Sequence, residues 1–172
     1  MNEVLNAIFS RRSIRAFTDE KLTKEELELL MKAGAAAPSA MNRQYFGFIA
    51  LTNAEKIAAL ADAVGKAVGR DGYNFYKPAA LIIPYTKADY ALGVDDNACA
   101  MENIYLAAHS LGIGCVWVNQ LRDTCSAPDV RALLTSFGVP EDCIVYGSAA
   151  VGHPAAPAAG EMERRAPIAI VD

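Results

Sequence analysis

Four short apolar runs, separated by segments with helical spacing, most constrain how this chain can fold. The runs cover residues 45–51, 79–85, 114–118 and 144–152. Each has the length and the β-branched or aromatic content of a strand. Because helical segments and short strands alternate along the chain, we expect an α/β or α+β class with one sheet flanked by helices.

Apolar residues at a spacing of three and four predict the helices between these runs. The predicted helices cover residues 2–10, 23 to about 34–37, 53 to about 69–72, 95 or 96 to 112, and 126–137. Thr23 and Glu26 form a capping-box pattern at the start of the second helix, and Asn53 can cap the third. The alanine-rich helix that ends near Gly112 suits either close packing in a subunit pair or an ordinary buried position.

The chain length of 172 residues suits a single domain over residues 1–172. Hydrophobic residues make up 53% and charged residues 21%, a composition that can bury a core and differs from that of disordered chains. The net charge is -4, whereas nucleic-acid-binding domains usually present a strongly basic surface. We therefore expect no nucleic-acid partner.

The apolar runs also bear on location. The run at 79–83 is far shorter than the roughly 20 residues that span a bilayer, so we expect no membrane partner. The first ten residues contain Glu3 and no basic residue, unlike a secretory signal. A cytoplasmic location is the default expectation.

The four cysteines are spaced too widely for a C-x-x-C redox or zinc pair. They are Cys99, Cys115, Cys125 and Cys143. Alanine, valine and isoleucine are common in the segments around them, and among such residues a thiol usually acts as a small apolar filler. We therefore expect no metal site.

Arg11, Arg12, Ser13 and Arg15 place three guanidinium groups and a hydroxyl within five residues. Arginine matches phosphate oxygens with two parallel donors, and serine adds a donor whose hydrogen can rotate. The simpler alternative is a solvated basic surface between two helices. A Rossmann site is a poor fit, because Gly112-Ile113-Gly114 lies between a helix and a strand, the reverse of the dinucleotide fingerprint.

Four motifs in order give the chain its resemblance to a known family. They are R-R-S-x-R at 11–15, P-S-x-x-N-x-Q at 38–44, L-A-A-H-x-L-G with G-x-x-W at 106–117, and G-x-P at 152–154 with the basic pair 164–165. This ordered set, which spans nearly the whole chain, resembles the small-subunit type of the nitroreductase family of FMN-dependent NAD(P)H oxidoreductases. The resemblance implies a three-layer α+β fold with a mostly antiparallel central sheet. It also implies a homodimer with FMN at the interface and a C-terminal tail, 153–172, that reaches the partner subunit.

The resemblance further implies which residues bind FMN. The phosphate and ring-edge contacts would come from Arg11, Arg12, Ser13 and Arg15, ring-edge donors from Asn74 and Lys77, and a tail contact from Arg164 or Arg165. Pro38, Ser39 and Asn42 would approach from the other subunit, and Trp117, Val118 and Asn119 would pass close to the ring.

The implied function is transfer of hydride from NADH or NADPH through FMN to nitroaromatics, quinones or similar electron-poor acceptors, by a ping-pong mechanism. The flavin performs the chemistry, so no catalytic side chain is required, although Lys77 could support negative charge on the reduced ring. Lys77 could equally be a solvated loop lysine. Two alternatives stay open: a specialised flavin enzyme of the same fold, for dehalogenation or a biosynthetic step, or a flavin-binding module without turnover.

Overall fold

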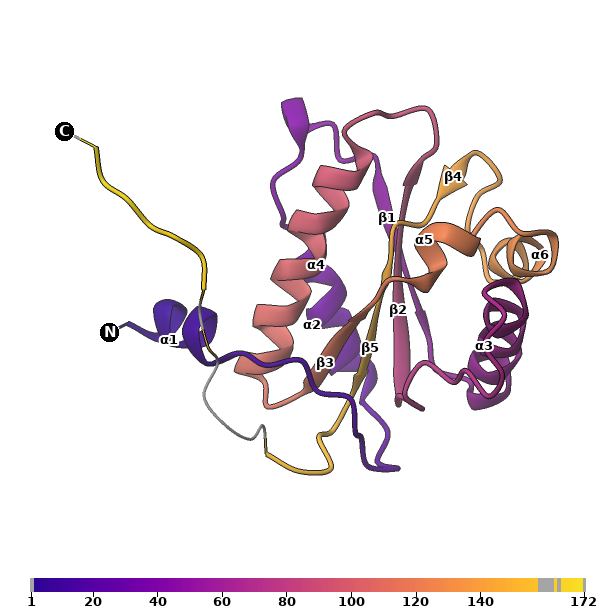
Figure 1. Ribbon diagram of the computed structural model, residues 1–172, viewed down its shortest axis with the longest axis horizontal. Coiled ribbons are helices and arrows are strands. Elements are labelled where there is room, and N and C mark those ends of the chain that lie inside the picture. The colour runs from indigo at the N-terminus through magenta and orange to yellow at the C-terminus, as the bar shows by residue number, and fades with distance from the viewer. Residues whose placement is uncertain (1, 158–162, 164, 172) are drawn as a thin grey trace.

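A five-stranded sheet, in which every strand pair is antiparallel, forms the centre of the computed structural model, which describes residues 2–157, 163 and 165–171 (Figure 1). Its strands are β1 (Phe46–Leu51), β2 (Ala80–Lys87), β3 (Gly114–Val118), β4 (Cys143–Ile144) and β5 (Ser148–Gly152). The order across the sheet is β1-β2-β5-β3, and β4 pairs with the end of β2.

Helices cover both faces of this sheet, so the predicted three-layer α+β architecture is confirmed (Figure 1). One face carries α2 (Lys24–Ala35) and α4 (Gly93–Ser110), and the other carries α3 (Ala54–Ala67), α5 (Gln120–Thr124) and α6 (Pro128–Ser136). Helix α1 (Glu3–Ser10) stands away from the sheet, and the short 3-10 helix η1 (Ala40–Asn42) lies beyond one end of it.

Strand β2 shows why two cores form. Leu81 and Ile83 point into the core beneath α3, whereas Ile82 points into the core beneath α4, and all three are fully buried. Alternate side chains of a strand point to opposite faces, so a continuous apolar run requires cover on both. The uninterrupted apolar run at 79–85 predicts a strand buried on both faces, and the structure confirms it.

Polar caps fix two helix starts where the sequence placed them. The Thr23 hydroxyl accepts a hydrogen bond from the Glu26 backbone N–H at 3.2 Å, and the Glu26 carboxylate accepts one from the Thr23 N–H at 2.7 Å. The Asn53 side chain accepts a hydrogen bond from the Lys56 N–H at 2.9 Å at the start of α3. Each cap satisfies backbone donors that the first helical turn leaves without a partner.

Several boundaries differ from the sequence prediction. Helix α4 begins at Gly93 rather than at Asp95 or Asp96, and the short helix α5 was not predicted. The run 144–152 is two strands, β4 and β5, because the chain turns at Gly147, whose φ is 155°. A Cβ at Gly147 would lie 2.4 Å from the Trp117 Nε1 atom, so only glycine lets the backbone pass the indole ring.

Both chain ends extend beyond the packed body. No residue of α1 is buried, and Val4 and Ile8 are 64% and 39% exposed. The β-like residues at 168–171 predict a last strand, but they form none and are an extended segment with Ile168 93% exposed. In the described residues, no helix combines the length and the apolar character needed to cross a bilayer.

Candidate functional site

The arginine-rich segment runs beside strand β3. The Ile14 backbone N–H donates a hydrogen bond to the Cys115 carbonyl at 3.0 Å. A Cβ at Gly114 would lie 2.8 Å from the Ile14 Cγ2 atom, so the glycine permits this close approach. The structure thus brings the first sequence motif, at 11–15, against the strand of the third motif, although about a hundred residues separate them (Figure 1).

Arg11 lies at the end of α1, with its guanidinium against α4. Its Cζ atom is 4.9 Å from the centroid of the Tyr105 ring, and its Nε atom is 3.7 Å from the Glu102 carboxylate. That distance is too long for a hydrogen bond, and the buried Nε atom has no hydrogen-bond partner among the described residues. A buried guanidinium N–H without an acceptor suits an anionic ligand.

Tyr105 connects this segment to the end of β3. Its hydroxyl accepts hydrogen bonds from the Ser13 side chain and the Trp117 backbone N–H. Burial raises the pKa of Tyr105 to about 12, although both donors and the Arg11 charge oppose this shift. The phenol therefore stays neutral and fixes Ser13 and Trp117 in place.

The other two arginines of the motif have different surroundings. Arg12 donates through Nη1 to the carbonyls of Phe9, Ser10 and Arg11 at 2.9–3.2 Å, and so satisfies the C-terminal end of α1. Arg15 is exposed, and its Cζ atom lies 6.0 Å from the centroid of the Tyr76 ring. This contact places the first motif beside the connector between α3 and β2.

That connector, residues 68–79, contains a left-handed turn. Phe75, Tyr76 and Lys77 have φ values of 50°, 67° and 50°, and the Asn74 side chain accepts a hydrogen bond from the Tyr76 N–H at 3.0 Å. Phe75 is fully buried and anchors the turn in the core. Non-glycine residues in this region cost roughly 1 kcal/mol or more each, and such strain clusters at functional sites.

A hydrogen bond joins the connector to the end of β3. The Tyr73 hydroxyl donates to the Gln120 Oε1 atom at 3.1 Å, and burial raises the pKa of Tyr73. Gln120 directly follows Asn119. Contacts therefore link three predicted groups of residues. The arginine motif is linked to the strand end at 117–119 through Tyr105 and to the Asn74–Lys77 turn through Tyr76.

The fourth predicted group lies elsewhere in the same chain. The loop 38–44 contains η1 and projects beside the N-terminal end of α4, whereas the arginine motif packs near its C-terminal half (Figure 1). Asp96, which contacts the loop, and Tyr105, which contacts Arg11, are nine positions apart, roughly 14 Å at 1.5 Å per residue. One chain therefore does not bring Pro38, Ser39 and Asn42 to the other site residues.

The loop 38–44 is also strained. Met41, Asn42 and Gln44 have φ values of 54°, 52° and 50°. The Ser39 hydroxyl accepts a hydrogen bond from the Gln44 N–H at 3.0 Å, and the Gln44 amide donates to the Asn42 Oδ1 atom at 2.8 Å. Among the described residues, the six non-glycine residues with positive φ all fall in this loop or in the turn 75–77.

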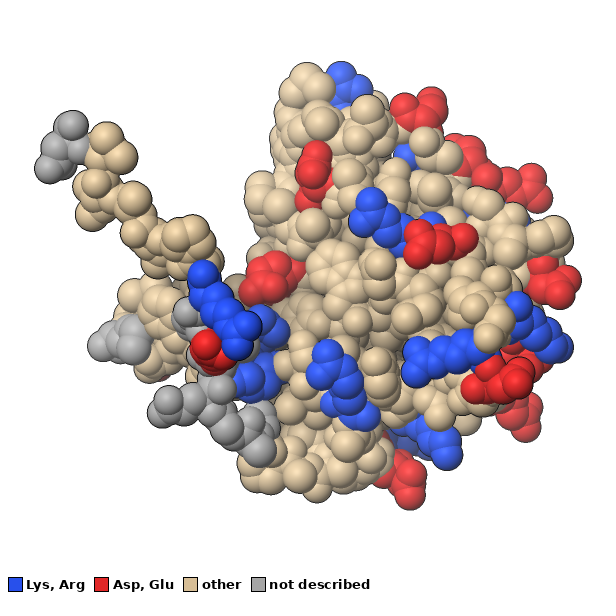
Figure 2. Space-filling view, viewed as in Figure 1, with Lys and Arg blue, Asp and Glu red and all other residues tan. Residues whose placement is uncertain are grey.

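The basic pair of the tail is only partly described. Arg165 is exposed and forms a 2.6 Å ion pair with the nearby Glu163 carboxylate, and Arg164 lies outside the described residues. Blue side chains gather at the base of the tail beside α1 in Figure 2, with red side chains next to them, and further red side chains are spread along the opposite edge of that face. The acidic protein therefore keeps a local basic surface beside the arginine motif.

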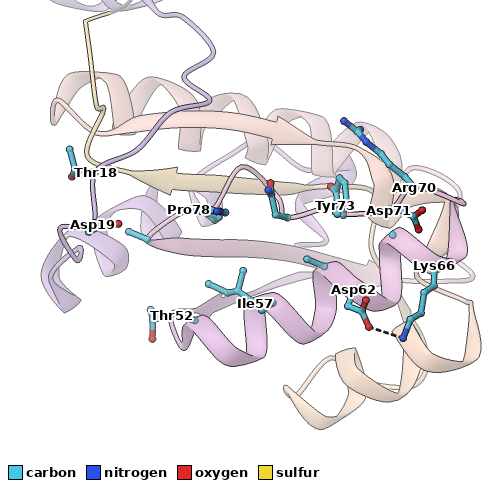
Figure 3. A pocket seen from close by; sticks show the side chains of 18 of the residues that line it. Thr18, Asp19, Thr52, Ile57, Asp62, Lys66, Arg70, Asp71, Tyr73 and Pro78 are labelled. Atoms are coloured by element: carbon cyan, nitrogen blue, oxygen red, sulfur yellow. Dashed lines mark ion pairs between the residues drawn. The ribbon is translucent and has the colours of Figure 1, made fainter.

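Two cavities divide the predicted residues. A groove of about 590 Å³ lies between α3 and the connector, and Asn74 and Lys77 are among its lining residues (Figure 3). A smaller cavity of about 210 Å³ is lined by Arg11, Arg12 and Tyr105. The described residues contain no group of three His, Cys, Asp or Glu side chains suited to a metal ion.

Comparison with known proteins identifies the family. The model of the nitroreductase family matches residues 8–74 and 69–153, which together cover most of the chain and all of the gathered site residues except those of the tail. The chain belongs to the nitroreductase family. A protein of Archaeoglobus fulgidus, named as an NADH dehydrogenase or NAD(P)H nitroreductase, is 34% identical over 90% of this chain and 87% of its own length. The NADPH-flavin oxidoreductase of Vibrio harveyi is 33% identical over 90% of this chain and 67% of its own length.

Solved nitroreductase structures share the fold over the full length. A nitroreductase from Bacteroides fragilis with bound FMN has a TM-score of 0.92 and 36% identity, with both chains covered completely. A nitroreductase from Desulfitobacterium hafniense with bound FMN has a TM-score of 0.87 and 25% identity, again with complete coverage. The family predicted from the four motifs is therefore confirmed.

Some residues that shape this nitroreductase site were not singled out from the sequence. Tyr105, Gln120 and Asp96 hold other residues in place through contacts between segments distant in sequence. The sequence could have indicated Tyr76 as a site residue, because it lies between the predicted Asn74 and Lys77 in an aromatic connector. Its backbone conformation is nevertheless a property of the folded chain only.

Proposed function

We propose that this chain passes hydride from NADH or NADPH through bound FMN to nitroaromatics, quinones or similar electron-poor acceptors by a ping-pong mechanism. Family membership and the relatives make it an NAD(P)H-dependent flavin oxidoreductase. One observation carries the assignment of the site: the left-handed non-glycine residues occur in the two segments predicted to contact the flavin. Such strain persists only where surrounding structure holds it.

The residues present fit an FMN phosphate at one end of the site. The buried Arg11 Nε atom lacks an acceptor among the described residues, and both Arg11 and Ser13 contact Tyr105. In our proposal Arg11 holds the phosphate, and the Ser13 hydroxyl turns its one hydrogen from Tyr105 to a phosphate oxygen. Arg12, Arg164 or Arg165 adds charge from outside. The bidentate geometry of arginine suits this role.

The other end fits the ring. Arg15, Asn74 and Lys77 provide two cations and an amide. Arg15 contacts the ring of Tyr76, which lies in the turn between Asn74 and Lys77. Bound FMN supplies the hydride acceptor and donor chemistry, and negative charge then develops at the N1/O2 edge of its ring. Lys77 or Arg15 would stabilise that charge, and Trp117, Val118 and Asn119 would line the ring face.

We also propose that the site is completed by a second copy of the chain. Pro38, Ser39 and Asn42 lie at the opposite end of α4 from the arginine motif, so they could reach a flavin only on a partner. The apolar surface of α1 and the exposed tail support this arrangement, since Val4, Ile168 and Ile170 are 64%, 93% and 92% exposed. Burying such residues against a partner would stabilise a homodimer.

An anaerobic absorbance experiment tests the reductase proposal. The purified protein with FMN is mixed with NADH, or with NADPH, and the flavin absorbance is followed before and after a nitroaromatic or quinone is added. We expect loss of the oxidised flavin spectrum with at least one donor and its return with the acceptor. A flavin that stays oxidised with both donors would favour a binding module without turnover, and reduction without reoxidation would favour a specialised enzyme.

A sedimentation experiment tests the shared site. Ile8→Glu places a charge on the exposed apolar surface of α1, so we expect a monomer that retains FMN poorly. Val68→Glu is the control, because Val68 is also exposed, at 41%, but lies at the end of α3. A monomeric wild-type protein that binds FMN with full affinity would contradict the shared site.

A further inference from the structure

We propose that Asp96 is a positioning residue that holds the loop 38–44 in the shape needed to contact FMN. Asp96 lies in the first turn of α4 and is 4% exposed. Its Oδ1 atom accepts a hydrogen bond from the Ala40 backbone N–H at 3.0 Å. This inference rests on the proposed function, because it assigns a role to a loop proposed to bind flavin.

The loop needs an external anchor because its own bonds fix only its internal shape. The Ser39–Gln44 and Gln44–Asn42 hydrogen bonds orient the Asn42 amide but connect loop residues only with one another. Among the described residues, the buried Asp96 side chain bonds the loop at Ala40, and the buried Thr86 hydroxyl donates to the carbonyl of Tyr45, the residue after the loop, at 2.7 Å. Since three loop residues adopt strained backbone angles, loss of an anchor would let the loop relax.

The surroundings of Asp96 indicate that a buried polar acceptor is kept at this position. Its Oδ2 atom is buried near the Tyr90 hydroxyl, which interacts with Asp96, but neither atom makes a hydrogen bond of normal geometry among the described residues. A carboxylate is costly to bury with so few bonds. Burial raises the pKa of Tyr90, and the negative charge of Asp96 and a weak side-chain hydrogen bond to Asp96 raise it further. The N-terminal end of α4 offsets part of the cost, because a helix dipole favours negative charge there.

Ala40 lies between two residues proposed to contact flavin, because Ser39 precedes it and Asn42 follows two positions later. The bond to Asp96 therefore acts at the centre of the binding loop. A loop already held in its bound shape loses less conformational freedom when the ligand binds. Removing the bond should weaken FMN binding without removing any group that touches FMN.

Two variants remove the same bond from opposite sides. Asp96→Ala removes the acceptor, and Ala40→Pro removes the donor. Proline is compatible at position 40, because Ser39 is extended, with φ -130° and ψ 147°, and Ala40 is the first residue of η1. Asp96→Asn keeps an oxygen acceptor, and Asp95→Ala alters the exposed neighbour in the same helical turn.

The experiment measures FMN affinity of the full-length apoprotein by quenching of flavin fluorescence. We expect Asp96→Ala and Ala40→Pro each to raise the Kd by about tenfold, and the double variant to raise it no further, because both act on one bond. Asp96→Asn should lie near wild type, as should Asp95→Ala. A Kd within twofold of wild type for Asp96→Ala, additive effects in the double variant, or an Asp96→Asn loss equal to that of Asp96→Ala would overturn the proposal.

Hydrogen exchange separates this proposal from the proposed function. In the flavin-free protein, we expect Asp96→Ala to speed amide exchange in residues 38–45 but not in the turn 73–78. If wild type binds no FMN while exchange at 38–45 still rises, the proposed function fails and the anchor stands. If wild type binds FMN while exchange at 38–45 is unchanged, the anchor is wrong and the proposed function stands.

Discussion

The guanidinium of Arg11 lies over the ring of Tyr105, with 4.9 Å between its Cζ atom and the ring centroid. This contact fixes a cation beside Ser13 while leaving its buried Nε atom without a hydrogen-bond acceptor among the described residues. The aromatic ring thus holds the arginine in place without using its hydrogen-bond donors. Its position is what the proposed phosphate site requires.

Arg11→Ala should raise the Kd for FMN by about 10- to 100-fold, because a hydrogen bond to a charged group contributes roughly 1.5–3 kcal/mol. Equilibrium titration of the apoprotein measures the change. Lys24→Ala is the charge-matched control, since Lys24 lies at the exposed start of α2. An unchanged Kd for Arg11→Ala would remove its phosphate role.

Tyr105→Phe should destabilise the protein near neutral pH by about 1–3 kcal/mol, because the buried Trp117 N–H loses its acceptor. This difference should shrink in alkali. The pKa of Tyr105 is raised in the folded protein to about 12 from 10.0, so its stabilising contribution is complete below pH 10 and is lost as the pH rises toward 12. Urea unfolding of both proteins across this range measures the difference, and a constant difference would contradict the assignment.

Lys77→Met should lower the midpoint potential of bound FMN, because a cation beside the ring favours the reduced, negatively charged form. We expect a change of about 30 mV or more, which corresponds to about 1.4 kcal/mol for a two-electron couple. Lys56→Met, on the exposed side of α3, should leave the potential unchanged. An unchanged potential in Lys77→Met would return Lys77 to the role of a solvated loop lysine.

Tyr76→Val should be less stable than Tyr76→Gly by about 1–2 kcal/mol, because the φ of 67° penalises a β-branched residue and not glycine. Both variants remove the aromatic ring, so the comparison isolates the backbone. The valine and glycine substitutions at Ala59, an exposed helical position in α3, should rank in the opposite order of stability, since glycine is the poorer helix former. Urea unfolding measures both pairs, and equal stability of the two Tyr76 variants would refute the strain argument.

The tail and α1 carry apolar residues that a single chain leaves exposed. Ile168, Ile170 and Val171 are at least 92% exposed, and Figure 1 shows this segment extending away from the sheet beside α1. A short β-forming run can be predicted from its residues alone, but a strand exists only when a neighbour supplies hydrogen bonds. The sequence therefore predicted the segment's preference and not its state in one chain.

Local patterns in the sequence determined most of the elements of this protein and the residue types of its site. The capping box at Thr23, the Asn53 cap, the apolar run of β2 and the R-R-S-x-R motif act through neighbouring residues, so they can be seen without coordinates. Only the tertiary structure decided which of these motifs meet. Tyr105, Gln120 and Asp96 hold the site segments through hydrogen bonds to residues 12, 47 and 56 positions away. The left-handed angles of residues 41, 42, 44 and 75–77 lie in two of these segments. Pairings between distant residues depend on how the layers pack, and no local preference in the sequence encodes them.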